Sequence, residues 1–218
     1  MDIKTICTHI DHTLLAPTST WPEVRRICDE ALEYEAASIC IPPCYVRDAA
    51  AYLAGRLPVC TVIGFPNGYS TAAAKVEETR RALKDGAEEI DMVINVAFLK
   101  DGRADEVWEE IAALRRETKG KILKVIVETC YLTEEEKKLM CQIVRETGAD
   151  YIKTSTGFGT GNATPEDVAL FARCLEGSNV RIKASGGIRT WEDAELYLSL
   201  GADRLGSSAL IKSLADTE

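Results

Sequence analysis

The sequence is poor in residues that build several common kinds of site. It has only two histidines, His9 and His12, and its eight cysteines form no C-x-x-C pair, so no His-rich or zinc-binding metal site is expected. Lys and Arg total 26 against 35 Asp and Glu, and this net charge of -9 argues against a nucleic-acid partner. We expect the cysteines to be buried free thiols.

Long apolar runs are also missing. No segment approaches the roughly 20 apolar residues of a membrane span, and the N-terminal "MDIKTICTHIDHTLL" has no basic stretch followed by an apolar one. A membrane partner is therefore not expected, and a cytoplasmic location is. The 218 residues, 46% of them hydrophobic, predict a single domain spanning residues 1–218.

What the chain does contain is an alternation of short apolar runs and amphipathic stretches. Eight strands are predicted, over 8–13, 37–42, 59–64, 89–95, 123–128, 151–155, 180–185 and 203–208. Helical patterns separate them, among them 71–85, 104–118 and 191–200. Eight such units predict a (β/α)8 TIM barrel, whereas an open doubly wound sheet would need a G-x-G-x-x-G after its first strand, which "DHTLLAPTST" lacks.

Charged residues stand inside several of these predicted strands. Because side chains alternate across a strand, Lys153 in "YIKTS" and Lys183 in "VRIKAS" face the barrel interior if their isoleucine neighbours face the helices. Asp91 and Lys124 are inward by the same argument. One carboxylate and three amines in a barrel mouth indicate a catalytic site.

This cluster predicts amine chemistry. A free lysine titrates near roughly 10.4, so burial and a second ammonium are needed to lower its pKa and make it a nucleophile toward a carbonyl. We expect Lys183 to lower the pKa of Lys153, and Asp91 with Lys183 to relay protons while an iminium accepts electrons from the adjacent C–C bond. Alternation does not decide which lysine attacks. The alternative is a structural ionic network in which both lysines pair with Asp91 and Glu128.

Three glycine- and hydroxyl-rich loops follow the last three predicted strands: "STGFGTGNATPED", "SGGIRTWED" and "GSSALIK". Backbone N–H groups at glycine turns and helix starts bind phosphate without net positive charge. Loops after the last two strands are the usual phosphate site of such barrels. The sequence thus predicts a phosphate site.

Together these residues resemble the deoxyribose-phosphate aldolase family. The matching segments include "IDHTLL", "VIGFPNG", "LKVIVETCYLT", "GADYIKTSTGF" and "IKASGGIRTWEDA", in the family's order over nearly the whole chain. The resemblance implies a class I aldolase that interconverts 2-deoxy-D-ribose 5-phosphate with D-glyceraldehyde 3-phosphate and acetaldehyde, without metal or organic cofactor. We expect it to act as a homodimer or higher homo-oligomer.

The resemblance also implies residue roles. Lys153 matches the family's Schiff-base lysine, Lys183 its second lysine and Asp91 its proton-relay aspartate. The expected substrate-binding positions are Asp11, Thr13, Cys40, Lys124, Gly157, Gly186, Gly187, Gly206, Ser207 and Ser208. Phe158 departs from members that have a phosphate-facing lysine there.

Two other functions remain open from the sequence. One is a Schiff-base aldolase on the same barrel with a different donor, and the other is a phosphosugar-binding barrel without turnover.

Overall fold

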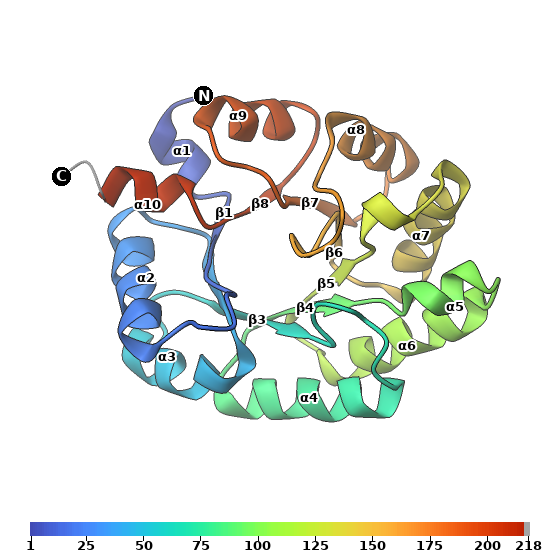
Figure 1. Cartoon of the computed structure of the whole chain (residues 1–218), viewed down its shortest axis with the longest axis horizontal. Coiled ribbons are helices and arrows are strands. Elements are labelled where there is room, and N and C mark those ends of the chain that lie inside the picture. Colours follow the sequence, from blue (N-terminus) through green and yellow to red (C-terminus); the bar gives the residue numbers. More distant parts are fainter. Residues whose placement is uncertain (216–218) are drawn as a thin grey trace.

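The computed structural model describes residues 1–215, so residues 216–218 of the predicted domain lie outside it. Eight parallel strands close into a barrel in chain order, with β8 pairing with β1 (Figure 1). They are β1 (Ile10–Thr13), β2 (Ser38–Ile41), β3 (Val59–Ile63), β4 (Glu89–Val93), β5 (Ile122–Ile126), β6 (Tyr151–Lys153), β7 (Arg181–Ser185) and β8 (Arg204–Ser207). The predicted TIM barrel is confirmed, and the doubly wound alternative is wrong.

Helices surround the barrel as an outer ring (Figure 1). They are α1 (Ile3–Cys7), α2 (Trp21–Glu33), α3 (Val46–Leu53), α4 (Ala72–Asp85), α5 (Val96–Lys100), α6 (Ala104–Glu117), α7 (Glu134–Thr147), α8 (Pro165–Cys174), α9 (Trp191–Ser199) and α10 (Leu210–Ala215), with 3-10 turns η1 (Pro43–Tyr45) and η2 (Thr129–Tyr131). Within residues 1–215, none of these helices combines the length and apolar character needed to cross a bilayer.

Local sequence signals fix several helix ends. Thr133 and Glu136 form a capping box at the start of α7, and Gly148 ends that helix in the left-handed conformation with φ 69°. The Thr164 side chain accepts a hydrogen bond from Asp167 N at the start of α8, where Pro165 is the first helical residue. These ends determine where each loop returns to the next strand.

The hydrophobic core lies between the strands and the helices, because alternate strand residues face outward. Ile90, Met92, Val125, Ile152 and Ile182 are buried there with the apolar faces of the helices. Each such buried side chain contributes about 1.5–3 kcal/mol. Inside the barrel, the separate apolar cluster contains only Cys40, Cys60 and Val62 as buried members of the described chain. Buried charged groups also lie in this interior.

Strand pairing places these charged groups side by side in two pairs. Lys153 is the direct partner of Lys183 across β6 and β7, and Asp91 is the direct partner of Lys124 across β4 and β5. The predicted strands at 8–13 and 151–155 are longer than the observed ones: α1 and a turn precede Ile10, and β6 ends at Lys153. The Lys153 side chain therefore stands at the carboxyl end of its strand, where barrel sites lie.

Candidate active site

Asp91 is the centre of the charged cluster. Its Oδ2 atom accepts hydrogen bonds from Lys153 Nζ at 2.8 Å and from Lys183 Nζ at 2.7 Å, and its Oδ1 atom accepts one from Lys124 Nζ at 2.8 Å. Both side chains of the Lys153–Asp91 pair are buried. The predicted convergence of Asp91 with three inward lysines is confirmed.

Two further carboxylates and an arginine lie around this centre. Asp11 accepts hydrogen bonds from Lys183 and from Arg204, and Glu89 Oε2 lies 2.5 Å from Lys124 Nζ and 3.1 Å from Arg204 Nη1. The Arg204 guanidinium also lies 5.6 Å from the centre of the Tyr151 ring, within cation–π range. Sequence reasoning missed Glu89 and Arg204.

The cluster stabilises its charged forms. Burial by itself would lower the pKa of Lys183, but the Asp11 and Asp91 carboxylates raise it above the ordinary value. Burial would likewise raise the pKa of Asp91, but Lys124, Lys153 and Lys183 hold it well below the ordinary value. The carboxylates therefore favour the ammonium form of Lys183, which is the charged form in which it was expected to act on Lys153.

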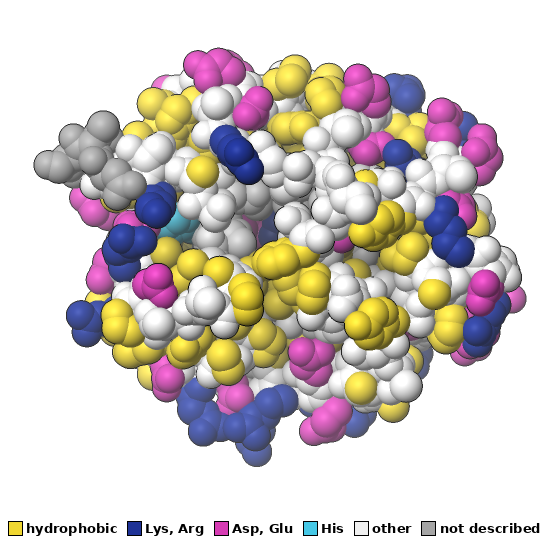
Figure 2. Space-filling model, viewed as in Figure 1, with side chains coloured by type: hydrophobic (Ala, Val, Ile, Leu, Met, Phe, Trp, Pro, Cys, Tyr) yellow, Lys and Arg dark blue, Asp and Glu magenta, His cyan; other side chains and the backbone are white. Residues whose placement is uncertain are grey.

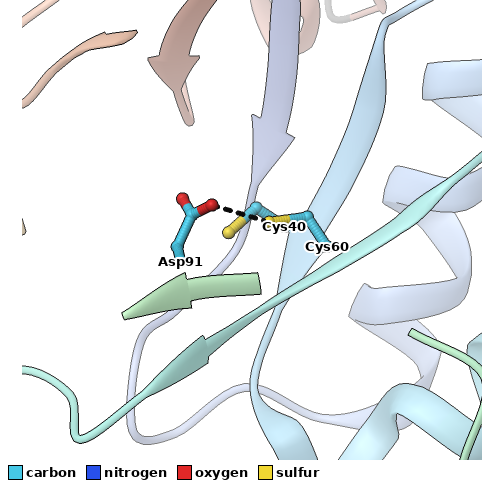
Figure 3. A group of neighbouring side chains, drawn as sticks. All are labelled: Cys40, Cys60 and Asp91. Atoms are coloured by element: carbon cyan, nitrogen blue, oxygen red, sulfur yellow. Dashed lines mark hydrogen bonds between the residues drawn. The ribbon is translucent and has the colours of Figure 1, made fainter. Parts of the chain in front are cut away.

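Two thiols, of Cys40 and Cys60, lie beside the Asp91 carboxylate (Figure 3). The Cys60 thiol donates to Asp91 Oδ1 at 3.2 Å, and Lys124 Nζ donates to Cys60 Sγ at 3.3 Å. Burial raises the pKa of Cys60, whereas the hydrogen bond from Cys60 lowers the pKa of Cys40 despite the burial of that thiol. The thiols thus take part in the polar network as well as in the small apolar cluster with Val62.

These groups include potential metal ligands. Cys40, Cys60 and Asp91 lie within 4.8 Å of one another, as do Asp11, Cys60 and Glu89. Their carboxylates are already paired with three lysines and one arginine, so a metal ion would add charge to a cluster that has four cations against three carboxylates. The donor set therefore does not fit a metal ion. That the site works without a metal stays a prediction, and this charge balance favours it.

A cavity of about 580 Å³ opens at the barrel mouth. Figure 2, in the same view as Figure 1, shows the hollow near the middle of this face, with hydrophobic side chains along one border. Of the three clustered lysines, only Lys153 lines the cavity; its exposed fraction is 3%, against 0% for Lys124 and Lys183. An incoming carbonyl can reach Lys153 first.

The predicted phosphate loops form the far part of the same cavity. Its lining includes Thr13, Gly157, Gly186, Gly187, Gly206, Ser207 and Ser208, as expected, together with Asn162, Arg189 and Lys212, which sequence reasoning missed. Gly186 and Gly187 have φ values of 83° and 77°, and a Cβ atom on Gly186 would lie 2.8 Å from Asn162 Oδ1. Within residues 1–215, no partner accepts from the backbone N–H groups of Gly157, Gly186, Gly187 or Ser208.

Five predicted site residues do not line the cavity. Asp91 contacts both Lys153 and Lys183, while Asp11, Cys40 and Lys124 are fully buried outside the cavity lining, and their contact with a substrate stays a prediction. Glu128, expected in the alternative ionic network, pairs with neither lysine; its carboxylate accepts from Thr156 instead. The alternative structural ionic network is therefore right in pairing both lysines with Asp91 and wrong in pairing them with Glu128.

A closed barrel with a cavity-lining lysine beside a carboxylate and a second buried lysine defines an enzyme of the lysine-dependent aldolase class. The comparisons with known proteins agree. A family model described as DeoC/LacD family aldolase matches residues 5–204, and the chain therefore belongs to this family and is a carbon–carbon lyase.

Curated relatives span the whole chain. A deoxyribose-phosphate aldolase of Clostridium botulinum (strain Eklund 17B / Type B) is 54% identical over 100% of this chain and 98% of its own length. One of Streptococcus pyogenes serotype M4 (strain MGAS10750) is 56% identical over 97% of this chain and 95% of its own. The solved deoxyribose phosphate aldolase of Aeropyrum pernix, described as tetrameric, superposes with a TM-score of 0.90 at 30% identity, covering 99% of this chain and 93% of that one.

Proposed function

We propose that this chain catalyses the reversible cleavage of 2-deoxy-D-ribose 5-phosphate into D-glyceraldehyde 3-phosphate and acetaldehyde. The observation that carries the proposal is the position of Lys153 Nζ at the cavity, 2.8 Å from the Asp91 oxygen that also contacts Lys183. Full-length relatives named for this reaction support the same substrate.

Lys153 is the nucleophile in this proposal. Lys183 contacts two carboxylates and Lys124 contacts three, whereas Lys153 contacts Asp91 alone within the described chain. With all seven groups ionised, four cations face three carboxylates, and one excess positive charge remains. A neutral amine at Lys153 removes that excess and provides the lone pair that attacks the C1 carbonyl.

Asp91 and Lys183 move the protons. Attack by Lys153 gives a carbinolamine, and loss of water from it, with a proton passed along the Asp91 bridge, gives an iminium. The bond that then breaks is C2–C3, because acetaldehyde keeps carbons 1 and 2 of the sugar. The electron pair of that bond becomes the enamine, the C3 hydroxyl loses its proton, and glyceraldehyde 3-phosphate leaves. Protonation of the enamine carbon and hydrolysis release acetaldehyde and the free lysine.

The loops that line the far part of the cavity bind the phosphate. Four unpaired backbone N–H groups and the Ser208 hydroxyl supply hydrogen bonds, while Arg189 and Lys212 supply positive charge. The Ser207 hydroxyl contributes indirectly: it donates to Ile188 O at 2.9 Å and accepts from the backbone at the start of α10.

Trapping tests the nucleophile and separates the alternatives. Borohydride reduction in the presence of acetaldehyde is expected to add one ethyl group at Lys153, located by peptide mass mapping, and a coupled assay is expected to detect glyceraldehyde 3-phosphate released from deoxyribose 5-phosphate. Incorporation of dihydroxyacetone phosphate instead of acetaldehyde would indicate the aldolase with another donor. Binding of the sugar phosphate without trapping or turnover would indicate the non-catalytic barrel.

We further propose a cytoplasmic homo-oligomer. All eight cysteines are free thiols, which suits a reducing compartment. Large apolar side chains are exposed on the helix ring, including Trp108 on α6 and Leu139 on α7, and are available for a subunit interface. Light scattering during size-exclusion chromatography measures the subunit number, and a monomer at micromolar concentration would contradict the assembly.

A further inference from the structure

Glu128 combines two unusual properties at the end of β5. It occupies the left-handed backbone region with φ 56° and ψ 66°. This conformation costs free energy in any residue other than glycine. Two other non-glycine residues of the described chain share that region, Glu35 and Ala54, but both stand at the exposed ends of helices, where this conformation is common. Glu128 instead follows a barrel strand beside the cavity.

The Glu128 carboxylate is buried without a cation. Its exposed fraction is 3%, and no Lys, Arg or His within residues 1–215 forms an ion pair with it. Within the described chain, the hydrogen-bond donors to this carboxylate belong to one residue: Thr156 N lies 3.2 and 3.3 Å from its two oxygens, and the Thr156 hydroxyl donates to Oε2. A buried carboxylate retained with a single neutral partner is costly.

Thr156 transmits this contact to the cavity. It lies three residues after Lys153, and its hydroxyl oxygen accepts a hydrogen bond from Phe158 N at 3.0 Å. Between them, Gly157 has φ 84° and its N–H has no partner within the described residues, although Thr156, Gly157 and Phe158 all line the cavity. The Glu128 contact thus fixes a turn in which the Phe158 N–H donates to the Thr156 hydroxyl and the Gly157 N–H is left for a ligand.

The neighbouring loop also fits around this carboxylate. A Cβ atom on Gly159 would lie 3.1 Å from Glu128 Cδ and 3.2 Å from Oε1, so the chain passes directly over the acid group. Backbone hydrogen bonds from Val127 N to Lys153 O and from Thr129 N to Thr154 O hold the two segments on either side. The left-handed backbone of Glu128 lies between these two anchors.

We propose that Glu128 is a positioning residue that presents the Thr156–Phe158 turn to the sugar phosphate and thereby sets substrate affinity rather than the amine chemistry. This inference rests on the proposed function, since the turn matters only if the substrate extends from Lys153 toward the phosphate loops. It assigns Glu128 no contact with the substrate or with Lys153.

Glu128→Gly tests the proposal, because glycine adopts the same backbone conformation without strain and removes only the side chain. Loss of hydrogen bonds to a buried charged group is expected to raise the KM for deoxyribose 5-phosphate about tenfold or more, with kcat within about threefold of the parent. Borohydride trapping of acetaldehyde on Lys153 is expected to proceed at the parent rate. Glu128→Gln, which keeps one acceptor oxygen, is expected to recover most of the affinity.

Two controls make the result specific. Glu35→Gly places the same substitution at the exposed left-handed glutamate at the end of α2, and is expected to keep the parent kinetics. Thr156→Val removes the hydroxyl that joins Glu128 to Phe158 N but keeps the β-branched side-chain shape, and combining it with Glu128→Gly is expected to raise KM no further than the larger single effect.

The proposal would be overturned if the KM of Glu128→Gly equals that of the parent. It would also be overturned if kcat and the trapping rate both fall along with the affinity, because that result indicates a general structural role. If Glu128→Gly does not fold, Thr156→Val with unchanged KM overturns it alone. Failure of trapping in the parent protein would instead refute the proposed function.

Discussion

Lys183 Nζ lies 2.7 Å from Asp91 Oδ2, although the two residues are 92 positions apart and stand on strands β7 and β4. The same oxygen receives Lys153 Nζ at 2.8 Å. One carboxylate oxygen therefore connects the fully buried Lys183 with the amine that reaches the cavity. A proton can pass between the two lysines through this oxygen or a water molecule beside it.

Lys183→Met tests this connection. The substitution removes the ammonium ion and is expected to lower kcat for deoxyribose 5-phosphate cleavage by about 10²–10⁴, the usual range for loss of an acid–base group. The steady-state coupled assay measures it. Lys138→Met, which removes an exposed ammonium on α7, is the matched control and is expected to leave kcat unchanged. A Lys183→Met enzyme as fast as the parent would exclude the proton bridge.

The charged cluster also predicts how stability varies with pH. The pKa values of Asp11 and Asp91 are lowered below their ordinary 3.8, so their stabilisation is fully present above that value and is lost as pH falls through the lower folded-state values. The pKa values of Lys124 and Lys183 are raised above 10.5, so their stabilisation is present below that value and is lost as pH rises beyond it.

Urea unfolding from pH 7 down to pH 3 measures the acid part of this prediction. The free energy of unfolding is expected to fall most steeply below about pH 4 in the parent. The free energy of unfolding of Asp91→Asn is expected to be lower at pH 7 and to fall less steeply with pH, because one carboxyl group with a lowered pKa has been removed. Identical slopes for the two proteins would show that the Asp91 pKa is not lowered.

Strand alternation was sufficient to predict the centre of the site. Lys153, Lys183, Lys124 and Asp91 each have apolar neighbours that must face the helices, so the period of two places all four inside the barrel. The same rule failed for Glu128, because the backbone turns left-handed just after β5 and the alternation ends there. A single sequence gives no signal for that turn.

The raised pKa of Lys183 could not be predicted from its own strand. Its neighbours in sequence indicate burial, which lowers a lysine pKa, whereas the carboxylates that raise it come from β1 and β4. Glu89 and Arg204 were missed for a related reason. Both stand at the first position of a strand, where a charged residue usually lies in solvent at the end of the preceding loop. These two are buried only because the barrel closes around them.

A second buried ion pair predicts a large effect on stability away from the cavity. Lys75 Nζ on α4 donates to Glu110 Oε1 at 2.6 Å and to Val93 O at 2.7 Å, and Glu110 Oε2 accepts from Asn95 N at 3.1 Å. Lys75→Met leaves a buried carboxylate unpaired and is expected to cost about 3–5 kcal/mol in urea unfolding.

The double variant separates charge from packing. Lys75→Met combined with Glu110→Leu removes both charges and is expected to recover most of the lost stability. If the double variant is as unstable as Lys75→Met, the loss comes from packing around the lysine stem rather than from the unpaired Glu110.

Phe158 predicts how strongly the cavity selects a phosphorylated substrate. Its ring is 52% exposed, lines the cavity next to Gly157, and contacts Phe65 edge to face at 5.3 Å between ring centres. Phe158→Lys places a cation beside the phosphate loops and is expected to lower the KM for deoxyribose 5-phosphate about threefold to tenfold, since partly exposed charge-assisted contacts contribute about 1 kcal/mol. The KM for unphosphorylated deoxyribose is expected not to fall, because that sugar has no anion to attract.

Two measurements distinguish this charge effect from loss of the aromatic pair. Phe158→Met removes the ring without adding charge, so any change that it shares with Phe158→Lys comes from the lost contact with Phe65, which is worth about 0.5–1.5 kcal/mol. The gain in Phe158→Lys is also expected to shrink as potassium chloride is raised, because salt screens exposed charges within a Debye length of about 8 Å at physiological ionic strength. A gain that is equal for both sugars, or that does not depend on salt, would place the phosphate away from Phe158 and leave its recognition to the loops after β7 and β8.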